Sequence, residues 1–172
     1  MNIYILDDLI IYSFLKKYER SSVNKKLWKA CILGHLELAN LMIEKGADWW
    51  NWGLDGACRG RHRELVDLMI EKGADDWNRV LHGACKGGYR ELVDLMIEKG
   101  ADGWNRALYG ACVGGNRELA EWMIKKKGAN DWNSGLDGAC RGGHQELAEM
   151  MIEKGADLKS CTNESHSHGI YL

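Results

Sequence analysis

Residues 56–75 read Gly-Ala-Cys-Arg-Gly-Arg-His-Arg-Glu-Leu-Val-Asp-Leu-Met-Ile-Glu-Lys-Gly-Ala-Asp. The Ala-Cys pair of this stretch, Ala57-Cys58, occurs in five places, with spacings of 27, 27, 27 and 28 residues: Ala30-Cys31, Ala57-Cys58, Ala84-Cys85, Ala111-Cys112 and Ala139-Cys140. A Glu-Leu pair and a Gly-Ala pair return with it each time. Self-similarity at a fixed period in this range predicts a protein built from stacked repeats.

Each repeat predicts two antiparallel helices. The first carries Gly, Ala and Cys and ends at a Gly-rich turn, and we expect its N-cap to be an asparagine: Asn51, Asn78, Asn105 or Asn133. The second carries Leu65, Leu68 and Met69 at i, i+3 and i+4, and Gly73 follows where a positive φ is expected. One pair cannot bury its own apolar faces, so five pairs are expected to stack around one elongated core.

The pattern Gly-Ala-Cys-x-x-Gly-His-x-Glu-Leu-x-x-x-Met-Ile-x-x-Gly-Ala-Asp resembles the ankyrin repeat over about residues 23–157. Gly34-His35 with Leu36-Glu37-Leu38 and Gly143-His144 with Glu146-Leu147 match it most fully. The resemblance implies an all-α, ankyrin-like helical-repeat solenoid that binds other proteins. The Trp-Asn pairs and the Met-Ile-Glu-Lys-Gly-Ala-Asp endings resemble the short ankyrin-type repeats of large DNA viruses.

Two departures from the family pattern lead to structural expectations. The usual unit of about 33 residues contains a projecting β-hairpin, whereas here only Asp76-Trp77 or Gly103-Trp104 separates one repeat from the next. We therefore expect the hairpin to be shortened or absent. The fourth repeat has one extra residue in the run Lys125-Lys126-Lys127, which is expected to bulge or lengthen its second helix.

The repeats divide the chain into three expected segments. Residues 1–22 carry an apolar stripe and are expected to form an N-terminal capping helix, since an F-box would need a leucine-proline opening that is absent. Residues 158–172 are polar and expected to form a disordered tail, which leaves the last repeat without an evident cap. Between them lie five repeats: 23–49, 50–76, 77–103, 104–131 and 132–157.

Composition and charge limit the classes of function. The 23 basic and 25 acidic residues nearly balance, which argues against a general polyanion-binding role. No stretch is long and apolar enough to suggest a membrane helix, and residues 1–22 do not read as a signal peptide. We expect an intracellular protein, in the host cytoplasm or a virion.

The six cysteines are expected to be thiols. Five of them share one repeat position, where stacked neighbours would lie about 10 Å apart, beyond the reach of a disulfide. We interpret them as small buried hydrophobes in a reducing compartment. Cys161, His166 and His168 in the tail are too loosely spaced to predict a metal site.

Comparison among the five repeats separates fixed positions from variable ones. Variable positions at offsets of 0, 3, 7 and 10 residues from Trp52 fall on one side of the first helix and its turn. Their Trp, Tyr, His and Arg content is typical of interface hot spots. We expect a partner-binding surface at Trp52, Asp55, Arg59, Arg79, His82, Lys86, Tyr89, Arg106, Tyr109 and Arg141. Unconstrained drift of solvent-exposed positions is the alternative explanation.

Other recurring residues are better explained by structure. Trp50, Trp77, Trp104 and Trp132 are expected to pack between repeats, and the Arg and acidic residues at i and i+4, such as Arg63 and Asp67, to form surface ion pairs. No catalytic, phosphate-binding or dinucleotide-binding motif is evident, so we expect no enzyme activity and no cofactor.

Two functions remain open at this stage. The first is a non-catalytic scaffold that binds a host or viral protein through the variable first-helix face. The second is a self-assembling structural protein, because an uncapped end that exposes apolar surface can stack head to tail on another copy. Nucleic-acid binding through Arg59, Lys86 and Arg141 is a weaker possibility, since acidic residues interrupt the basic charge.

Overall fold

The computed structural model describes residues 13–161. The chain divides into two compact units, Met1–Asp75 and Asp76–Leu172, and each is described separately. Every regular element between residues 13 and 161 is helical. The predicted all-α, ankyrin-like repeat fold is confirmed, and the short loops that join one repeat to the next within each unit contain no strand, so the β-hairpin is absent there. A single core shared by all five helix pairs stays a prediction.

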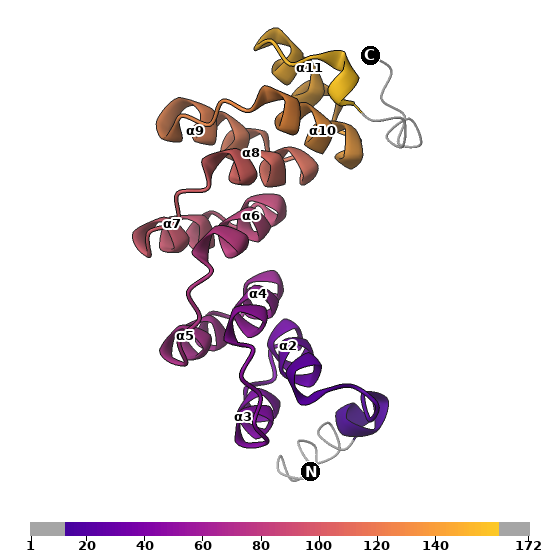
Figure 1. The fold of residues 1–172 in the computed structure, drawn as a ribbon, viewed down its shortest axis with the longest axis vertical. Coiled ribbons are helices and arrows are strands. Elements are labelled where there is room, and N and C mark those ends of the chain that lie inside the picture. Colours follow the sequence, from indigo (N-terminus) through magenta and orange to yellow (C-terminus); the bar gives the residue numbers. More distant parts are fainter. Residues whose placement is uncertain (1–12, 162–172) are drawn as a thin grey trace, which may run out of the picture. The chain divides into compact units, whose positions relative to one another are not determined.

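The N-terminal unit contains two helix pairs. The first helices lie side by side (Figure 1), and the bounds are α2 Val23–Leu33, α3 Leu36–Glu44, α4 Trp50–Gly60 and α5 Arg63–Glu71. Residues 13–17 are helical, and Phe14 among them is buried. The rest of the expected capping helix, residues 1–12, lies outside the described residues.

The C-terminal unit contains three helix pairs and a short 3-10 helix. Its elements are α6 Trp77–Gly87, α7 Arg90–Glu98, α8 Trp104–Val113, α9 Arg117–Lys127, α10 Trp132–Gly142, α11 Gln145–Glu153 and η1 Leu158–Ser160. The first helices α6, α8 and α10 pack in order, and each also packs on the second helix of its own pair (Figure 1).

Glycines bring successive first helices into close contact. A Cβ placed on Gly110 of α8 would lie 2.5 Å from the carbonyl oxygen of His82 in α6. A Cβ on Gly138 of α10 would lie 2.8 Å from the carbonyl oxygen of Tyr109, and one on Gly56 of α4 would lie 2.7 Å from that of Trp28. Real Cβ atoms do not approach oxygen this closely, so the stacking distance within each unit requires glycine at these positions.

The second helices form the expected apolar face. Leu65 and Met69 of α5 are buried, and the methionines in the same register are buried as well: Met42, Met96, Met123 and Met151. The glycine after each second helix has a positive φ, as predicted. The first helices end at glycine-rich turns except in the second repeat, where Arg61 takes the left-handed conformation with φ 61°. A side chain there costs roughly 1 kcal/mol relative to glycine.

The extra residue of the fourth repeat lengthens its second helix. Helix α9 has 11 residues, whereas α5 has 9. The N–H of Ala129 reaches back six positions to the carbonyl of Met123, whereas Ala74 reaches back five, to Met69. The insertion is therefore accommodated at the helix end, and Gly128 still closes the turn.

The prediction that asparagines cap the first helices is wrong. The N-cap residues are Trp49, Asp76, Gly103 and Asp131, and only the two aspartates accept a backbone hydrogen bond there. The asparagines lie inside the first turn and bind the loop that closes their own repeat. The Asn78 side chain accepts from the N–H groups of Asp102 and Gly103, at 2.9 and 2.8 Å, and donates to the Asp102 carboxylate at 3.0 Å.

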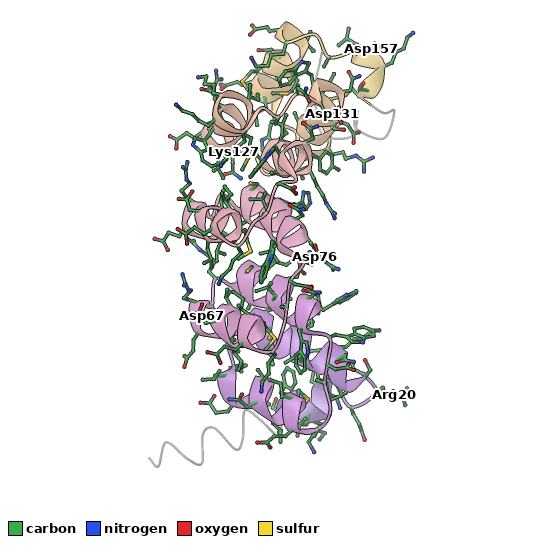
Figure 2. All side chains as sticks on the ribbon, turned by 60° about the vertical axis from the view of Figure 1, so that its left-hand side comes forward. Arg20, Asp67, Asp76, Lys127, Asp131 and Asp157 are labelled. Atoms are coloured by element: carbon green, nitrogen blue, oxygen red, sulfur yellow. A yellow bond between two sulfur atoms is a disulfide. The ribbon has the colours of Figure 1, made fainter. Side chains whose placement is uncertain are left out.

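Every repeat contains this asparagine contact. The backbone N–H groups bound are those of Asp48 by Asn24, Asp75 by Asn51, Asp102 by Asn78, Asn130 by Asn105 and Asp157 by Asn133. Figure 2 labels Asp131 and Asp157 in two of these loops. We call this set the asparagine clasp. It joins the start of a repeat to its end across 24 or 25 residues.

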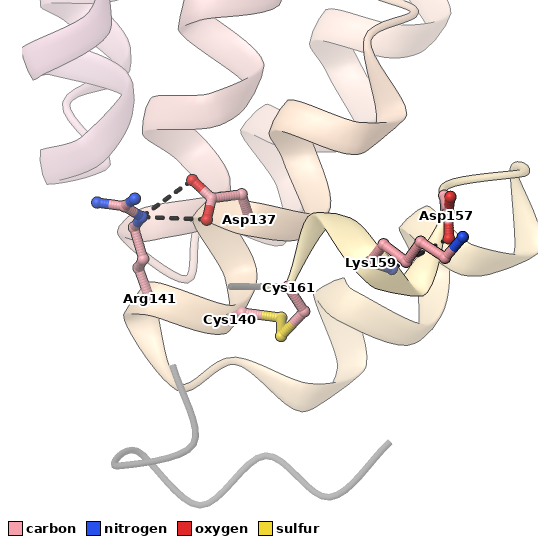
Figure 3. Close-up of a disulfide and its surroundings, with 6 residues drawn as sticks. All are labelled: Asp137, Cys140, Arg141, Asp157, Lys159 and Cys161. Carbon is pink, nitrogen blue, oxygen red and sulfur yellow. Dashed lines mark hydrogen bonds and ion pairs between the residues drawn. A yellow bond between two sulfur atoms is a disulfide. The ribbon is translucent and has the colours of Figure 1, made fainter. Parts of the chain in front are cut away.

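The prediction that all cysteines are thiols is wrong for two of them. Cys140 of α10 forms a disulfide with Cys161 (Figure 3), and their Cα atoms lie 5.9 Å apart. The repeated cysteines do not bridge one another, as expected, and Cys31, Cys58, Cys85 and Cys112 are free and buried. The tail also does not become irregular at residue 158, because η1 packs against α10. Residues 162–172 lie outside the described residues.

Changing Gly110 to Ala should destabilise the protein by roughly 1–3 kcal/mol, because the new methyl group overlaps a backbone oxygen that cannot move independently. Gly87→Ala is the matched control, since the three atoms nearest to its Cβ all belong to the far end of the Tyr89 side chain and none to the backbone. Urea denaturation followed by circular dichroism measures both. Equal stability of the two variants would show that α6 and α8 do not need this close contact.

Changing Asn78 to Ala should cost about 1–2 kcal/mol, because two backbone N–H groups lose their acceptor. Asn78→Asp should cost at least as much at pH 7, because it places a second carboxylate beside Asp102. Asn40→Ala is the control, since Asn40 is exposed on α3. If Asn40→Ala proves as destabilising as Asn78→Ala in urea denaturation, the clasp does not contribute specifically to stability.

Candidate functional site

The predicted surface residues of the C-terminal unit lie on neighbouring first helices. His82 of α6 stacks on Tyr109 of α8, with ring centroids 5.7 Å apart, and its Nδ1 lies 3.0 Å from the carbonyl oxygen of Arg106. Both rings are half-buried, while the Lys86 and Arg106 side chains are exposed. The geometry therefore places an aromatic pair beside two basic side chains.

On α10 the charges are balanced locally. Arg141 forms an ion pair with Asp137 one turn earlier, with Nε 2.9 Å from a carboxylate oxygen (Figure 3). Arg79 at the start of α6 is half-buried, and its backbone N–H is capped by Asp76. The exposed basic side chains of this surface in the C-terminal unit include Lys86 and Arg106.

In the N-terminal unit, Asp55 is a core residue of the repeat contact. Its side chain is only 4% exposed and lies 3.0 Å from Nε of Arg59. It also accepts a hydrogen bond from the indole N–H of Trp28, at 3.4 Å, across the boundary between α2 and α4. The expectation that this variable position is solvent-exposed is wrong for Asp55, because the large neighbouring indole covers it.

An exposed tryptophan pair begins α4. Trp52 is 41% exposed and Trp49 is 46% exposed, and their ring centroids lie 5.5 Å apart. Trp52 belongs to the predicted surface, and the irregular position of Trp49 in the repeats is consistent with its exposure, whereas Trp28 was not among the residues predicted. The repeat register would have identified Trp28, which occupies the same position as Asp55, His82 and Tyr109.

The turn position after the first helix contacts the repeat before it. Nε2 of His62 lies 3.2 Å from the carbonyl oxygen of Ile32, and the Asn116 amide donates to the carbonyls of Cys85 and Lys86. The His62 and His144 rings lie over Gly34 and Gly115, where no Cβ would fit. At these positions the residue type changes from repeat to repeat, but the side chain still contacts the preceding repeat. Tyr89 has the same register and is half-buried.

The outer side of the second helices carries ion pairs and one aromatic residue. The predicted pairs are confirmed, with Nε to carboxylate distances of 3.0, 3.1 and 3.0 Å for Arg63–Asp67, Arg90–Asp94 and Arg117–Glu121. Hydrogen bonds from Lys125 and Arg117 lower the pKa of Glu121. The ring centroid of Trp122 lies 4.2 Å from the Arg90 guanidinium carbon and 5.4 Å from Lys127 Nζ.

The four free cysteines lack the character of nucleophiles. Burial raises the pKa of Cys31, Cys58, Cys85 and Cys112 to about 12. Their thiols therefore stay protonated at neutral pH, and the thiolate is the reactive form. These side chains serve packing.

Comparison with known families agrees with this architecture. A model of three ankyrin repeats matches residues 81–162. This part of the chain contains ankyrin repeats. Such repeats generally mediate protein–protein interaction, and proteins built from them are typically non-catalytic scaffolds. No curated protein is similar enough to the chain to give a match.

The ankyrin repeats of residues 81–162 include the His82–Tyr109 pair and the Asp137–Arg141 pair. The helix pairs of residues 23–71 follow the same sequence pattern outside the matched range. None of the helices described between residues 13 and 161 is long and apolar enough to cross a membrane.

Changing Asp55 to Ala should destabilise the protein by about 1–2 kcal/mol, because the Trp28 indole N–H and Arg59 lose a buried partner. Asp137→Ala removes the same residue type from the same repeat position, but that side chain is 21% exposed, and the loss should stay below about 1 kcal/mol. Thermal and urea unfolding compare the two. A larger loss for Asp137→Ala would contradict the assignment of Asp55 to the repeat contact.

Proposed function

We propose that the chain is a non-catalytic scaffold that binds a protein partner through the exposed face of its first helices. This proposal rests on the contrast between positions that recur in every repeat and positions that vary. Glycine, alanine, cysteine and methionine positions recur because the stack requires them, whereas the outward positions change from repeat to repeat. A surface that keeps its scaffold and varies its side chains suits recognition of one particular partner.

The residue types favour a protein partner. Within the C-terminal unit, the half-buried His82–Tyr109 pair offers a flat aromatic contact, with Lys86 and Arg106 exposed near it. Tyr and Arg are enriched at interface hot spots because they combine contact area with hydrogen bonding. We infer a partner segment with an apolar side chain for the aromatic pair and acidic side chains for the basic residues.

In the N-terminal unit the same role falls to Trp52 and Arg59. Trp52 and Trp49 present a pair of exposed indoles, which is a large apolar area for a surface. Asp55 acts by holding Arg59 in position, since its carboxylate is buried. Among the ten predicted surface residues, Asp55 therefore contributes indirectly, by positioning the Arg59 side chain.

The glycine pattern supports partner binding over head-to-tail self-assembly. The later repeats carry Gly56 and Gly60, Gly83 and Gly87, Gly110 and Gly114, or Gly138 and Gly142 in the first helix. The first repeat has Lys29 and Leu33 at those positions. A second copy stacked on α2 in the manner of an interior repeat would overlap these side chains. Self-assembly stays the alternative.

Location and source are also proposals. An intracellular site, in a host cell or a virion, and a relation to the repeats of large DNA viruses stay predictions. Nucleic-acid binding is the least favoured partner class, because Asp55 and Asp137 neutralise Arg59 and Arg141 on this surface.

A charge-reversal pair tests the proposed surface. Lys86→Glu combined with Arg106→Glu should lower retention of the bound partner by tenfold or more in a quantitative pull-down, because both exposed cations are replaced by anions that repel an acidic partner. The melting temperature should change by less than about 2 °C, since neither side chain is buried.

The matched control places the same charge change at the C-terminal ends of the second helices α7 and α9. Lys99→Glu combined with Lys126→Glu alters two exposed lysines of the same unit and should leave retention unchanged. If both double variants lose the partner equally, binding follows net charge, and the proposed surface is wrong.

A further inference from the structure

Cys140 occupies a position that elsewhere is covered by the next repeat. Cys31 lies against α4, where the Cβ position of Gly56 is 3.2 Å from the cysteine Cβ. Cys112 lies against α10 in the same way, 3.3 Å from the Cβ position of Gly138. Cys140 is also fully buried, although α11 and η1 are the only described elements that follow α10. Its cover comes from η1 and Cys161.

The segment that covers Cys140 has little apolar contact of its own. None of the η1 residues is buried, and Leu158 is 56% exposed. Polar contacts also hold Asp157, just before η1: its N–H binds Asn133 of α10, and its carboxylate accepts from the N–H of Lys159 (Figure 3). The disulfide is therefore the main connection between residues 158–161 and α10.

The two sulfur atoms differ in access. Cys140 of α10 is fully buried, whereas Cys161 is half-buried near the end of the described chain. An external thiol or disulfide can therefore reach the Cys161 sulfur first. The four free cysteines are buried within the helix pairs and do not compete.

We propose that Cys161 is a thiol–disulfide exchange site. Its bond to Cys140 is then a reversible covalent closure of the last repeat, which we call the disulfide closure. The co-reactants are a low-molecular-mass disulfide for closing and a low-molecular-mass thiol for opening. This inference does not depend on the partner-binding function.

Closing takes two exchange steps that balance. The Cys161 thiolate attacks one sulfur of the external disulfide, which forms a mixed disulfide and releases one external thiolate. The Cys140 sulfur, after giving up its proton to solvent, then attacks the Cys161 sulfur and releases the second external thiolate. Two protein thiols are oxidised and one external disulfide is reduced to two thiols. Opening is the reverse, with the external thiolate attacking Cys161 and the Cys140 thiolate taking up a proton.

Opening should uncover the face of α10 on which a further repeat would stack. In the reduced chain, η1 keeps only its polar contacts and its exposed leucine, which is too little to hold a short segment against its conformational entropy. The last helix pair then has a neighbour on one side only, and local opening of that pair should become easier.

Trapping of the mixed disulfide tests the exchange site. Full-length Cys140→Ala, incubated with oxidised glutathione as the probe, should gain one glutathione by intact mass, placed on Cys161 by peptide mapping. Cys112→Ala is the control, and should form the internal disulfide and retain no adduct. Adducts on Cys31, Cys58, Cys85 or Cys112 in place of Cys161 would overturn the assignment.

The melting temperature and hydrogen exchange test the disulfide closure. Reduction of the native chain should lower its melting temperature by roughly 5–10 °C, because a disulfide that closes a 21-residue separation constrains the unfolded chain. Hydrogen exchange should rise in α10, α11 and η1 and stay constant in α4. These differences between the oxidised and the reduced protein should vanish in Cys161→Ala and persist in Cys112→Ala. If reduction changes neither the melting temperature nor the hydrogen exchange, the disulfide closure does not stabilise the last repeat.

Discussion

The close approach of successive first helices is the constraint on which each unit depends. At Gly56, Gly110 and Gly138, the backbone of one helix lies against a carbonyl oxygen of the helix before it, and even a methyl group would not fit. Alanine and cysteine fill the narrow interior, the second helices cover one side with leucine and methionine, and the remaining first-helix positions face outward. The candidate binding surface is therefore made of first-helix positions that the glycine contact leaves outside, except at Asp55, which is only 4% exposed.

Most of the fold could be predicted from the sequence, since its signals are local and recur five times. Apolar spacing defined the second helices, glycine defined the turns, and the short spacing between Gly-Ala-Asp and the next Trp excluded a hairpin. The asparagines were misassigned because N-cap preference is also a local signal, and a residue such as Asn78 satisfies it just before an apolar run. Its real partners lie 24 and 25 residues later. This sequence separation is close to the length of one repeat, so the contact can be identified only in the folded structure.

The candidate site was harder to predict because its environment comes from the preceding repeat. Asp55 and Asp137 are the same residue type at the same repeat position, and each is followed four residues later by an arginine with which it pairs. Yet Asp55 is 4% exposed and Asp137 is 21% exposed. The difference lies in the neighbour, since Trp28 covers Asp55 and donates a hydrogen bond to it, whereas Tyr109 holds the corresponding position before Asp137. A variable position in a repeat array thus takes its exposure from the residue one repeat earlier, and comparing repeats position by position does not reveal this.

The ends of the array need contacts that the repeats cannot provide. An interior repeat is held by near-identical neighbours on both sides, so one set of contacts serves every boundary. A terminal repeat has one neighbour, and its outer face must be closed by something that is not a repeat. The first repeat has Lys29 and Leu33 in place of the stacking glycines, and their side chains exclude the close approach that the glycines allow between later repeats. The fifth repeat keeps the same cysteine as the others, but there a covalent bond to Cys161 lies where a following repeat would stack. Because η1 buries none of its own residues, packing alone does not account for its position, and this makes chemistry at the sulfur atoms a means of controlling the end of the repeat array.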